Sequence, residues 1–202
     1  PLTPVPMPVW QQQLKWLSDK LMAFTGLVLL SPLLIFLALR VKAESPGPII
    51  YKQERVGKQG KPFIMYKFRT MYEEAEANGP QLSSLDDNRI TPFGRFMRKY
   101  RLDELPQFIN VLKGDMSLVG PRPERPCYVA QILEKAPHYY LVQQVLPGIT
   151  SWGMVKYGYA NSVEQMIQRL EYDMLYLENQ SLLLDCKILL FTIKPLISGK
   201  GM

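Results

Sequence analysis

The sequence predicts an α+β fold: a membrane-associated helical domain with a re-entrant broken helix, a small β-hairpin and amphipathic interfacial helices. Three observations predict it. An uncharged apolar segment, residues 21–39, is interrupted by a Ser-Pro pair. Two strand-like segments flank a loop bounded by Gly57 and Gly60, and apolar residues toward the C-terminus recur at spacings of three and four.

The composition is that of a chain with a packed core and an attraction for anions. The 202 residues are 47% apolar and 21% charged, which fits one domain with a membrane-associated appendage. The net charge is +6, and residues 51–101 hold eleven Lys/Arg against six Asp/Glu. This local excess predicts an anionic partner: nucleic acid, an acidic membrane surface or a phosphorylated substrate.

Histidine and cysteine are scarce, which excludes several kinds of active site. Cys127 and Cys186 are too few and too far apart in sequence for a disulfide framework, so a reducing compartment is the simpler interpretation. His138 is the one histidine, and we expect it to be a surface or packing residue. Zinc sites built on paired His or Cys and a Ser-His-Asp triad are therefore not expected. Chemistry should use carboxylates, basic groups and a hard metal ion.

The apolar segment from Leu21 to Leu39 has nineteen residues, roughly 29 Å of helix and about one hydrocarbon thickness. Pro32 removes a backbone hydrogen bond near its middle, and basic residues flank it on both sides: Lys15, Lys20, Arg40 and Lys42. Because the positive-inside bias places both flanks in the cytoplasm, we expect a helix that enters, breaks at Ser31-Pro32 and returns. The Ser31 hydroxyl would bond a carbonyl freed by the proline. The alternative is a proline-kinked spanning helix.

The other elements follow from local patterns. The first residues, "PLTPVPMP", are expected to be extended or disordered, and residues 44–71 to form a turn and two strands around the Gly57–Gly60 loop. Residues 73–92 are polar and predict a surface excursion, and two short helices should meet near Asp103. A structured but irregular proline-rich region follows, and then a helix over residues 162–178. The final apolar helix fits the bilayer interface or a buried core equally well.

Two adjacent acids, Asp103 and Glu104, follow the basic stretch "RFMRKYR". Neighbouring side chains point in different directions on a helix, so the two carboxylates can have separate roles at the first turn of a helix, where the dipole favours negative charge. An ionised Asp aimed at phosphorus is a competent nucleophile, and a neighbouring Glu can hold Mg²⁺. The alternative is a solvent-facing helix turn with incidental salt bridges.

Basic residues near the acids could keep both ionised and contact phosphate. They are Arg98, Lys99 and Arg101 just before the pair, and Lys67 and Arg69 of "YKFRT". "GPRP" places Arg122 between two prolines, a stiff mount for a phosphate-binding guanidinium. This combination favours chemistry on a phosphorylated substrate.

The sequence resembles the bacterial sugar transferases known as monotopic phosphoglycosyl transferases, over roughly residues 14–197. The matching stretches are "KWLSDKLMAFTGLVLLSPLL", "SPGPIIYKQERVGKQGKPFIMYKFRTM", "LDELPQFINVLKGDMSLVGPRP" and "PGIT". The resemblance implies transfer of a sugar-1-phosphate from a nucleotide diphosphate sugar, a UDP-sugar, to a polyprenyl phosphate, undecaprenyl phosphate, as the first membrane step of surface glycoconjugate assembly. It also implies a re-entrant helix broken at Ser31-Pro32.

By position, the resemblance makes Asp103 the nucleophile of a covalent phosphosugar intermediate and Glu104 its metal-associated partner, with Mg²⁺ held by both carboxylates. Arg98 and Arg122 become phosphate contacts, and Lys67 and Arg69 are weaker candidates for the same task. The expected partners are the two substrates and the lipid bilayer, and nucleic acid is not among them. The expected location is the bacterial inner membrane, with the active site on its cytoplasmic face.

The implied organisation is a proline-rich extension at 1–13, a re-entrant helix-break-helix at 14–42 and a cytoplasmic catalytic domain with interfacial helices at 43–202.

After "PGIT" the chain departs from the family pattern at Ser151, Trp152 and Met154, which puts sugar identity in doubt. The chain also lacks the four spanning helices of many relatives, so a natural short form and an excised catalytic part stay open, as does a homo-oligomer. The rival hypotheses are a membrane-anchored anion- or nucleic-acid-binding protein without catalysis, and an inactive scaffold.

Overall fold

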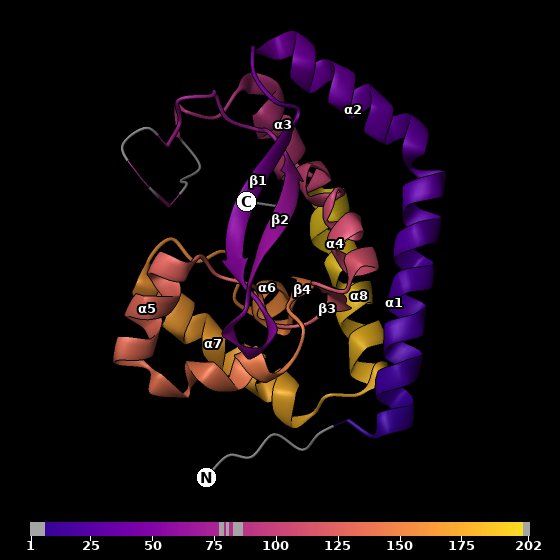
Figure 1. The fold of residues 1–202 in the computed structure, drawn as a ribbon, viewed down its shortest axis with the longest axis vertical. Coiled ribbons are helices and arrows are strands. Elements are labelled where there is room, and N and C mark those ends of the chain that lie inside the picture. Colours follow the sequence, from indigo (N-terminus) through magenta and orange to yellow (C-terminus); the bar gives the residue numbers. More distant parts are fainter. Residues whose placement is uncertain (1–6, 77–78, 80, 83–86, 200–202) are drawn as a thin grey trace.

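The computed structural model describes residues 7–76, 79, 81–82 and 87–199, apart from the side chains of 194–198. Helices and short sheets are mixed along the chain (Figure 1). The helices are α1 (Val9–Leu29), α2 (Ser31–Glu44), α3 (Pro92–Lys99), α4 (Gln107–Lys113), α5 (Pro126–Lys135), α6 (Trp152–Lys156), α7 (Val163–Glu178) and α8 (Leu182–Ser198). The strands are β1 (Ile50–Val56), β2 (Pro62–Phe68), β3 (Ser117–Val119) and β4 (Gly148–Thr150). The α+β prediction is confirmed.

Helices α1 and α2 form one long bent element along an edge of the molecule (Figure 1). Their axes differ by 65° at Leu30, so the break falls at the Ser-Pro pair. Pro32 has no N–H for the Val28 carbonyl, and the Ser31 hydroxyl donates to that carbonyl instead, at 2.8 Å. Among the described helices none is by itself long and apolar enough to cross a membrane; only this bent pair passes, by length and composition.

Helix α1 begins at Val9, inside the segment 1–13 that the sequence predicts to be an extension; residues 1–6 lie outside the described part of the chain. The predicted surface excursion at 73–92 is only partly described, because residues 77–78, 80 and 83–86 are outside that part as well.

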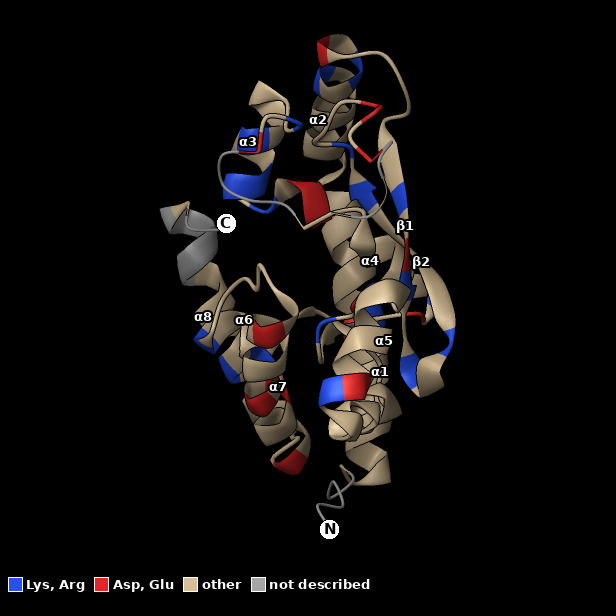
Figure 2. Ribbon diagram, turned by 90° about the vertical axis from the view of Figure 1, so that its left-hand side faces the viewer, with Lys and Arg blue, Asp and Glu red and all other residues tan. Residues whose placement is uncertain are grey.

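Strands β1 and β2 form the predicted hairpin, joined by Gly57 and a 3₁₀ turn at Lys58–Gly60. The strands are antiparallel, with Tyr51 opposite Lys67. Since alternate residues of a strand share a face and directly opposed residues do too, Tyr51, Gln53, Arg55 and Lys67 lie on one side of the hairpin. Figure 2 shows Lys and Arg (blue) along α3 and on this hairpin, where the sequence has its local basic excess.

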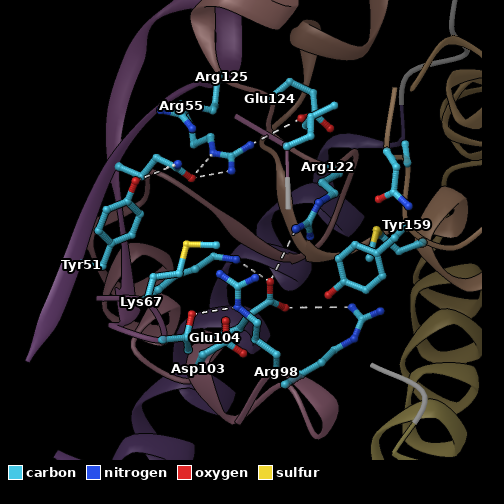
Figure 3. Close-up of a pocket in the computed structure, with 18 of the residues that line it drawn as sticks. Tyr51, Arg55, Lys67, Arg98, Asp103, Glu104, Arg122, Glu124, Arg125 and Tyr159 are labelled. Carbon is cyan, nitrogen blue, oxygen red and sulfur yellow. Dashed lines mark hydrogen bonds and ion pairs between the residues drawn. The ribbon is translucent and has the colours of Figure 1, made fainter. Parts of the chain in front are cut away.

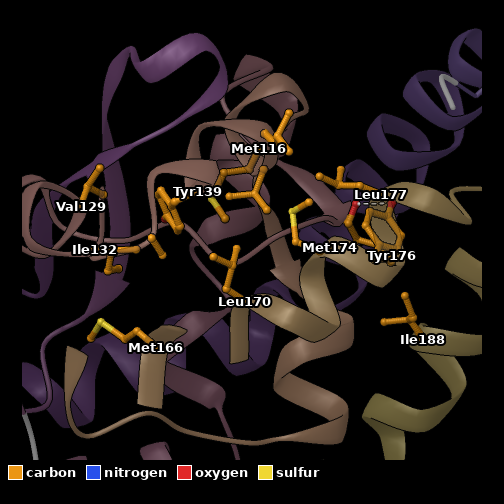
Figure 4. Close-up of a cluster of buried hydrophobic side chains, with 14 of the residues drawn as sticks. Met116, Val129, Ile132, Tyr139, Met166, Leu170, Met174, Tyr176, Leu177 and Ile188 are labelled. Atoms are coloured by element: carbon orange, nitrogen blue, oxygen red, sulfur yellow. Dashed lines mark hydrogen bonds between the residues drawn. The ribbon is translucent and has the colours of Figure 1, made fainter. Parts of the chain in front are cut away.

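The main hydrophobic core lies between α7 and the elements that surround it (Figure 4). The predicted helical spacing is confirmed, because Met166, Leu170, Met174 and Leu177 all face this core and are buried. Ser162 is the N-cap of α7, and its hydroxyl accepts a hydrogen bond from the backbone N–H of Gln165. Helix α8 adds Ile188, fully buried, while Leu183 is 82% and Leu190 67% exposed. The final helix thus has one core face and one exposed apolar face.

The irregular proline-rich region contains a parallel strand pair that the sequence did not predict. Ser117 in β3 pairs with Gly148 in β4, and the two backbones come so close that a Cβ on Gly148 would lie 2.1 Å from the Gly120 nitrogen. Three-residue strands are too short to give an alternating pattern, which is why the sequence left this region irregular. The pair positions the loop after β3, which carries Arg122.

A buried polar network ties α1 to the rest of the fold. The ammonium of Lys15 pairs with Asp185 at 2.6 Å and donates to the Val119 carbonyl at 3.0 Å, and Tyr176 donates to Asp185 at 2.8 Å. On sequence alone Lys15 counts as a basic flank of the apolar segment; in the structure its charge is paired with that of Asp185 inside the protein.

Candidate active site

A cavity of about 960 Å³ opens among the hairpin, the C-terminal end of α3, the loop after β3 and the segment around α6. Figure 3 shows charged side chains from these separate elements pointing into it. Both predicted acids line the cavity, together with Lys67, Arg98 and Arg122. Residues distant in sequence therefore meet here, and the basic residues face the acids.

Asp103 and Glu104 lie on a separate 3₁₀ turn, Leu102–Glu104, between α3 and α4. The sequence placed them in the first turn of a helix; this is corrected, since α4 begins only at Gln107. The leucines on either side, Leu102 and Leu105, pack on the apolar cluster that contains Leu37 and Val41 of α2. The second helix of the bent pair thus supports the acidic turn.

Glu104 is surrounded by cations. Its carboxylate lies 2.7 Å from the Lys67 ammonium, 3.6 Å from the Arg122 guanidinium and 4.0 Å from that of Arg101, and the residue is 5% exposed. Burial alone would raise the pKa of Glu104, but these cations outweigh it and hold the pKa below its usual range. Glu104 is therefore a permanent anion that organises the basic residues.

Asp103 has a different environment although it is the next residue. Burial raises the pKa of Asp103, the Glu104 charge acts in the same direction, and Lys67 and Arg98 oppose them without reversing the shift. Two adjacent carboxyls whose pKa values are moved in opposite directions can have different roles. A buried, incompletely compensated carboxylate is the more reactive of the two.

The predicted phosphate contacts do not all point the same way. Lys67, Arg98 and Arg122 line the cavity beside the acids, and the Arg98 Nε donates to the Thr70 hydroxyl at 2.8 Å. Arg69 also lines the cavity, but its guanidinium donates to the carbonyls of Ser45, at 2.7 Å, and Pro46. In this structure Arg69 closes the C-terminal end of α2 and does not reach the acids.

The loop that holds Arg122 is fixed by charges that sequence reasoning missed. Glu124 forms a buried ion pair with Arg169 of α7 and lies 3.4 Å from Arg55 of β1. The Glu124 carbonyl also accepts from the Val56 amide at 2.9 Å. Prolines stiffen the loop locally, but these contacts anchor it to two other elements. Glu124 lies within the motif "PRPER", which sequence reasoning could have singled out. No local sequence pattern indicates that Arg169 or Arg55 pairs with it.

Sequence reasoning also missed Tyr159, which lies beside Arg101 and Arg122. The ring of Tyr159 lies 5.0 Å from the Arg101 guanidinium and 5.6 Å from that of Arg122. Burial, and next the charge of Glu104, raises the pKa of Tyr159 to about 12, so the phenol stays neutral. No short motif in "KYGYAN" indicates this placement.

The carboxylate pair fits a hard divalent cation only in combination with substrate. Mg²⁺ is typically bound by one or two carboxylates together with phosphate oxygens and water. Within the described residues no group of three or more His, Cys, Asp or Glu side chains could hold a metal. Asp103 and Glu104 would supply the carboxylate oxygens, and substrate phosphates would supply the other ligands.

Comparison with known proteins gives a consistent answer over nearly the whole chain. The model of the family described as bacterial sugar transferase matches residues 10–199. The chain is 44% identical over 183 residues to a UDP-N-acetylgalactosamine-undecaprenyl-phosphate N-acetylgalactosaminephosphotransferase of Aeromonas hydrophila, covering 91% of the chain and 43% of that protein. It is 40% identical over 195 residues to a UDP-glucose:undecaprenyl-phosphate glucose-1-phosphate transferase of Escherichia coli, covering 96% and 42%.

The chain spans about two fifths of the length of those two relatives. An uncharacterized sugar transferase of Bacillus subtilis, 40% identical over 188 residues, is matched over 89% of its own length and 93% of this chain.

Proposed function

The chain belongs to the bacterial sugar transferase family, and on this premise we propose that it transfers a sugar-1-phosphate from a UDP-sugar to undecaprenyl phosphate and releases UMP. One observation carries the proposal. Two adjacent buried carboxylates with opposite pKa shifts lie in a cavity lined by Lys67, Arg98 and Arg122. Such a site suits an anionic diphosphate substrate and a carboxylate nucleophile.

In the first step a carboxylate oxygen of Asp103 attacks the phosphorus that bears the sugar. A bond forms between this oxygen and phosphorus, and the bond from phosphorus to the bridging oxygen breaks. UMP leaves with that electron pair, and the sugar phosphate stays on Asp103 as an acyl phosphate. The burial of Asp103 supports this role, because neighbouring cations compensate the charge of Asp103 less than that of Glu104.

In the second step a phosphate oxygen of the lipid acceptor attacks the same phosphorus. The bond to Asp103 breaks, the carboxylate is restored and the lipid diphosphate sugar leaves. Lys67 and Arg122 offset the negative charge on the phosphoryl oxygens in both steps, and Glu104 holds these cations in place. Both half-reactions can thus use one site.

We include Mg²⁺ in the proposal, held by Asp103 and Glu104 together with substrate phosphates, where it would neutralise phosphate charge. Activity should therefore be lost in excess EDTA and return with added MgCl₂. Full activity in the presence of the chelator would remove the metal from the mechanism.

The location proposed is the cytoplasmic face of the bacterial inner membrane, with α1 and α2 as a re-entrant pair. Many apolar side chains of this pair are exposed, among them Leu29 (72%), Leu39 (65%) and Ile35 (62%). Exposed apolar area of this extent favours a membrane surface. There the site could meet a soluble nucleotide sugar and a lipid phosphate, as the first membrane step of surface glycoconjugate assembly.

The test is UMP release from a set of nucleotide sugars, with and without undecaprenyl phosphate. UDP-N-acetylgalactosamine and UDP-glucose are the first donors to try, since they appear in the names of the two relatives. We expect one donor to give UMP and a radiolabelled lipid product, and intact mass of the protein with donor alone to show a phosphosugar adduct. A lipid product formed without any adduct would exclude the covalent route. An oligonucleotide gel shift without UMP release would favour the binding-protein rival.

A further inference from the structure

Arg101 is a mostly buried arginine whose Nε is not paired by the described residues. Its side chain is 10% exposed, and its Nε has no hydrogen-bond partner among them. The contact between its Nη1 and Glu104, at 4.0 Å, is at the outer limit of an ion pair. A buried N–H donor left without an acceptor is unfavourable. An arginine in this state is suited to a ligand with several acceptor oxygens.

The backbone at Arg101 adds a second observation. Its φ is +53°, in the left-handed region that side chains other than glycine and asparagine rarely adopt. This conformation ends α3 and turns the chain directly into the acidic 3₁₀ turn. The ring centre of Tyr159 lies 5.0 Å from the Arg101 guanidinium and 5.6 Å from that of Arg122. One aromatic ring thus contacts both arginines.

Parts of the cavity lining differ in chemistry. Tyr51, Gln53 and Arg125 form a polar part, with Glu76 paired to Arg125 at 2.6 Å. The lining also includes the apolar Val155 and Phe191, with the Lys156 ammonium 5.6 Å from the Phe191 ring. Figure 3 shows Tyr51 and Tyr159 on opposite sides of Glu104, with the yellow C-terminal helices on the Tyr159 side.

Phe191 connects the cavity to an exposed apolar surface. It is 43% exposed, and α8 also exposes Leu190 (67%) and Ile193 (47%), which are three residues apart and share a face of the helix. A ligand that approaches along this surface and ends in a phosphate would bring the phosphate to Arg101. A nucleotide has no apolar chain to place there, whereas a polyprenyl phosphate has one.

We propose that Arg101, Tyr159 and Arg122 form a phosphate subsite that binds the phosphate of the lipid acceptor during the second half-reaction; this rests on the proposed function. Arg101 donates to the acceptor phosphate oxygens, and Tyr159 holds its guanidinium by stacking. The acceptor phosphate is thereby placed next to Asp103 without competing for Lys67, which is paired with Glu104. Arg122 is shared with the transferred phosphoryl group, and Arg101 is the basic contact that belongs to the acceptor phosphate alone.

The first test measures the two half-reactions separately on the full chain in detergent micelles. Arg101→Gly removes the guanidinium and relieves the left-handed backbone, and Arg101→Lys keeps the charge but loses the planar donors. We expect adduct formation from the UDP-sugar alone to stay within about twofold of wild type. The kcat/KM for the acceptor should fall roughly tenfold to hundredfold in Arg101→Gly.

Tyr159→Leu and Tyr159→Phe examine the ring. Loss of the ring should raise the acceptor KM, while phenylalanine, which keeps a face for the guanidinium, should retain most of the acceptor affinity. Arg95→Met is the matched control: it removes an arginine from the preceding helix α3, at an exposed position away from the cavity wall, and should change neither half-reaction.

The second test is direct binding, which does not depend on turnover. Farnesyl phosphate in detergent and UMP are titrated separately into wild type and Arg101→Gly, whose folding is checked by thermal unfolding. Farnesyl phosphate should lose at least about tenfold in affinity and UMP less than about twofold. Equal loss for both probes, or a slowed adduct formation, would assign Arg101 to the donor phosphate and overturn the proposal. If wild type releases no UMP with any donor, the proposed function fails, and these titrations still decide whether the phosphate subsite exists.

Discussion

Asp103 and Glu104 are adjacent, yet their surroundings move their pKa values in opposite directions. Glu104 contacts three basic side chains, whereas burial dominates at Asp103. The direction of the pKa shift at each residue decides whether its ionised form stabilises or destabilises the fold. A carboxyl with a lowered pKa stabilises the fold when ionised, and one with a raised pKa destabilises it when ionised. Two substitutions test this difference.

Asp103→Asn should abolish turnover, by at least about a thousandfold, because it removes the proposed nucleophile at nearly constant volume. The free energy of unfolding at neutral pH should stay the same or rise. The sign follows from the raised pKa: stability falls as pH rises through it, so removal of the ionised group is not destabilising. UMP release and denaturant unfolding check the two parts. Residual activity above a few per cent, with deamidation excluded by mass, would contradict the assignment.

Glu104→Gln should lower the free energy of unfolding by about 3 kcal/mol at pH 7, because it leaves Lys67, Arg122 and Arg101 facing a neutral amide. The lowered pKa means that the wild-type advantage is complete above the ordinary value of 4.5 and disappears as pH falls well below it. Urea unfolding at a series of pH values measures this. Glu164→Gln is the control, since its pair with Lys135 is exposed to solvent and should contribute little to stability. Equal losses in the two variants would contradict the interpretation.

At the scale of elements, the break between α1 and α2 and the position of the acidic turn are connected. Leu37 and Val41 of α2, with Phe68 and Met97, form the apolar cluster against which Leu102 and Leu105 pack. The direction of α2 after the 65° bend therefore decides where this cluster, and with it the acidic turn, is placed.

Replacing both Ser31 and Pro32 with leucine should restore a continuous helix and shift the segment at least partly toward spanning, with loss of activity. In the native chain we expect residues near positions 12 and 45 to lie on the same, cytoplasmic side. Single cysteines at these positions, labelled in intact cells, measure this after Cys127 and Cys186, which are both exposed, are changed to serine. Ile35→Leu is the control because it leaves the break in place. A periplasmic N-terminus in the native chain would show that Pro32 is a kink in a spanning helix.

At the scale of the whole molecule, one buried ion pair joins the first helix of the chain to the last. Lys15 of α1 and Asp185 of α8 are 170 residues apart in sequence and 2.6 Å apart in space. Both side chains are mostly buried, and Ser117 of β3 donates to the nearby Asp19 at 2.5 Å. The helical pair and the catalytic part are thus fixed to each other by polar as well as apolar contacts.

Lys15→Met should lower the free energy of unfolding by about 3 kcal/mol, because it leaves the Asp185 charge buried without its partner. Adding Asp185→Leu should recover part of the loss, and a double-mutant cycle gives the coupling energy. Lys20→Met on the same helix is the matched control and should have little effect. Additive losses in the cycle would mean that the pair does not couple these helices.

The sequence by itself determined the features that depend on neighbouring residues. The helix break follows from Pro32, and the hairpin follows from the turn between Gly57 and Gly60. Helix α7 follows from the spacing of its apolar residues, and the acid pair from the motif "LDELPQ". In each case the cause and its effect are close in the chain, so no knowledge of the fold is needed.

Only the tertiary structure decided which residues share the cavity and what each one does there. Arg69 and Lys67 are two residues apart, but Arg69 closes α2 while Lys67 pairs with Glu104. Arg101 and Tyr159 are 58 residues apart in the sequence (159 − 101) and are in contact in the structure. A pKa shift likewise depends on burial and on charges brought from other elements. These properties belong to contacts between distant segments, and such contacts leave no local pattern in the sequence.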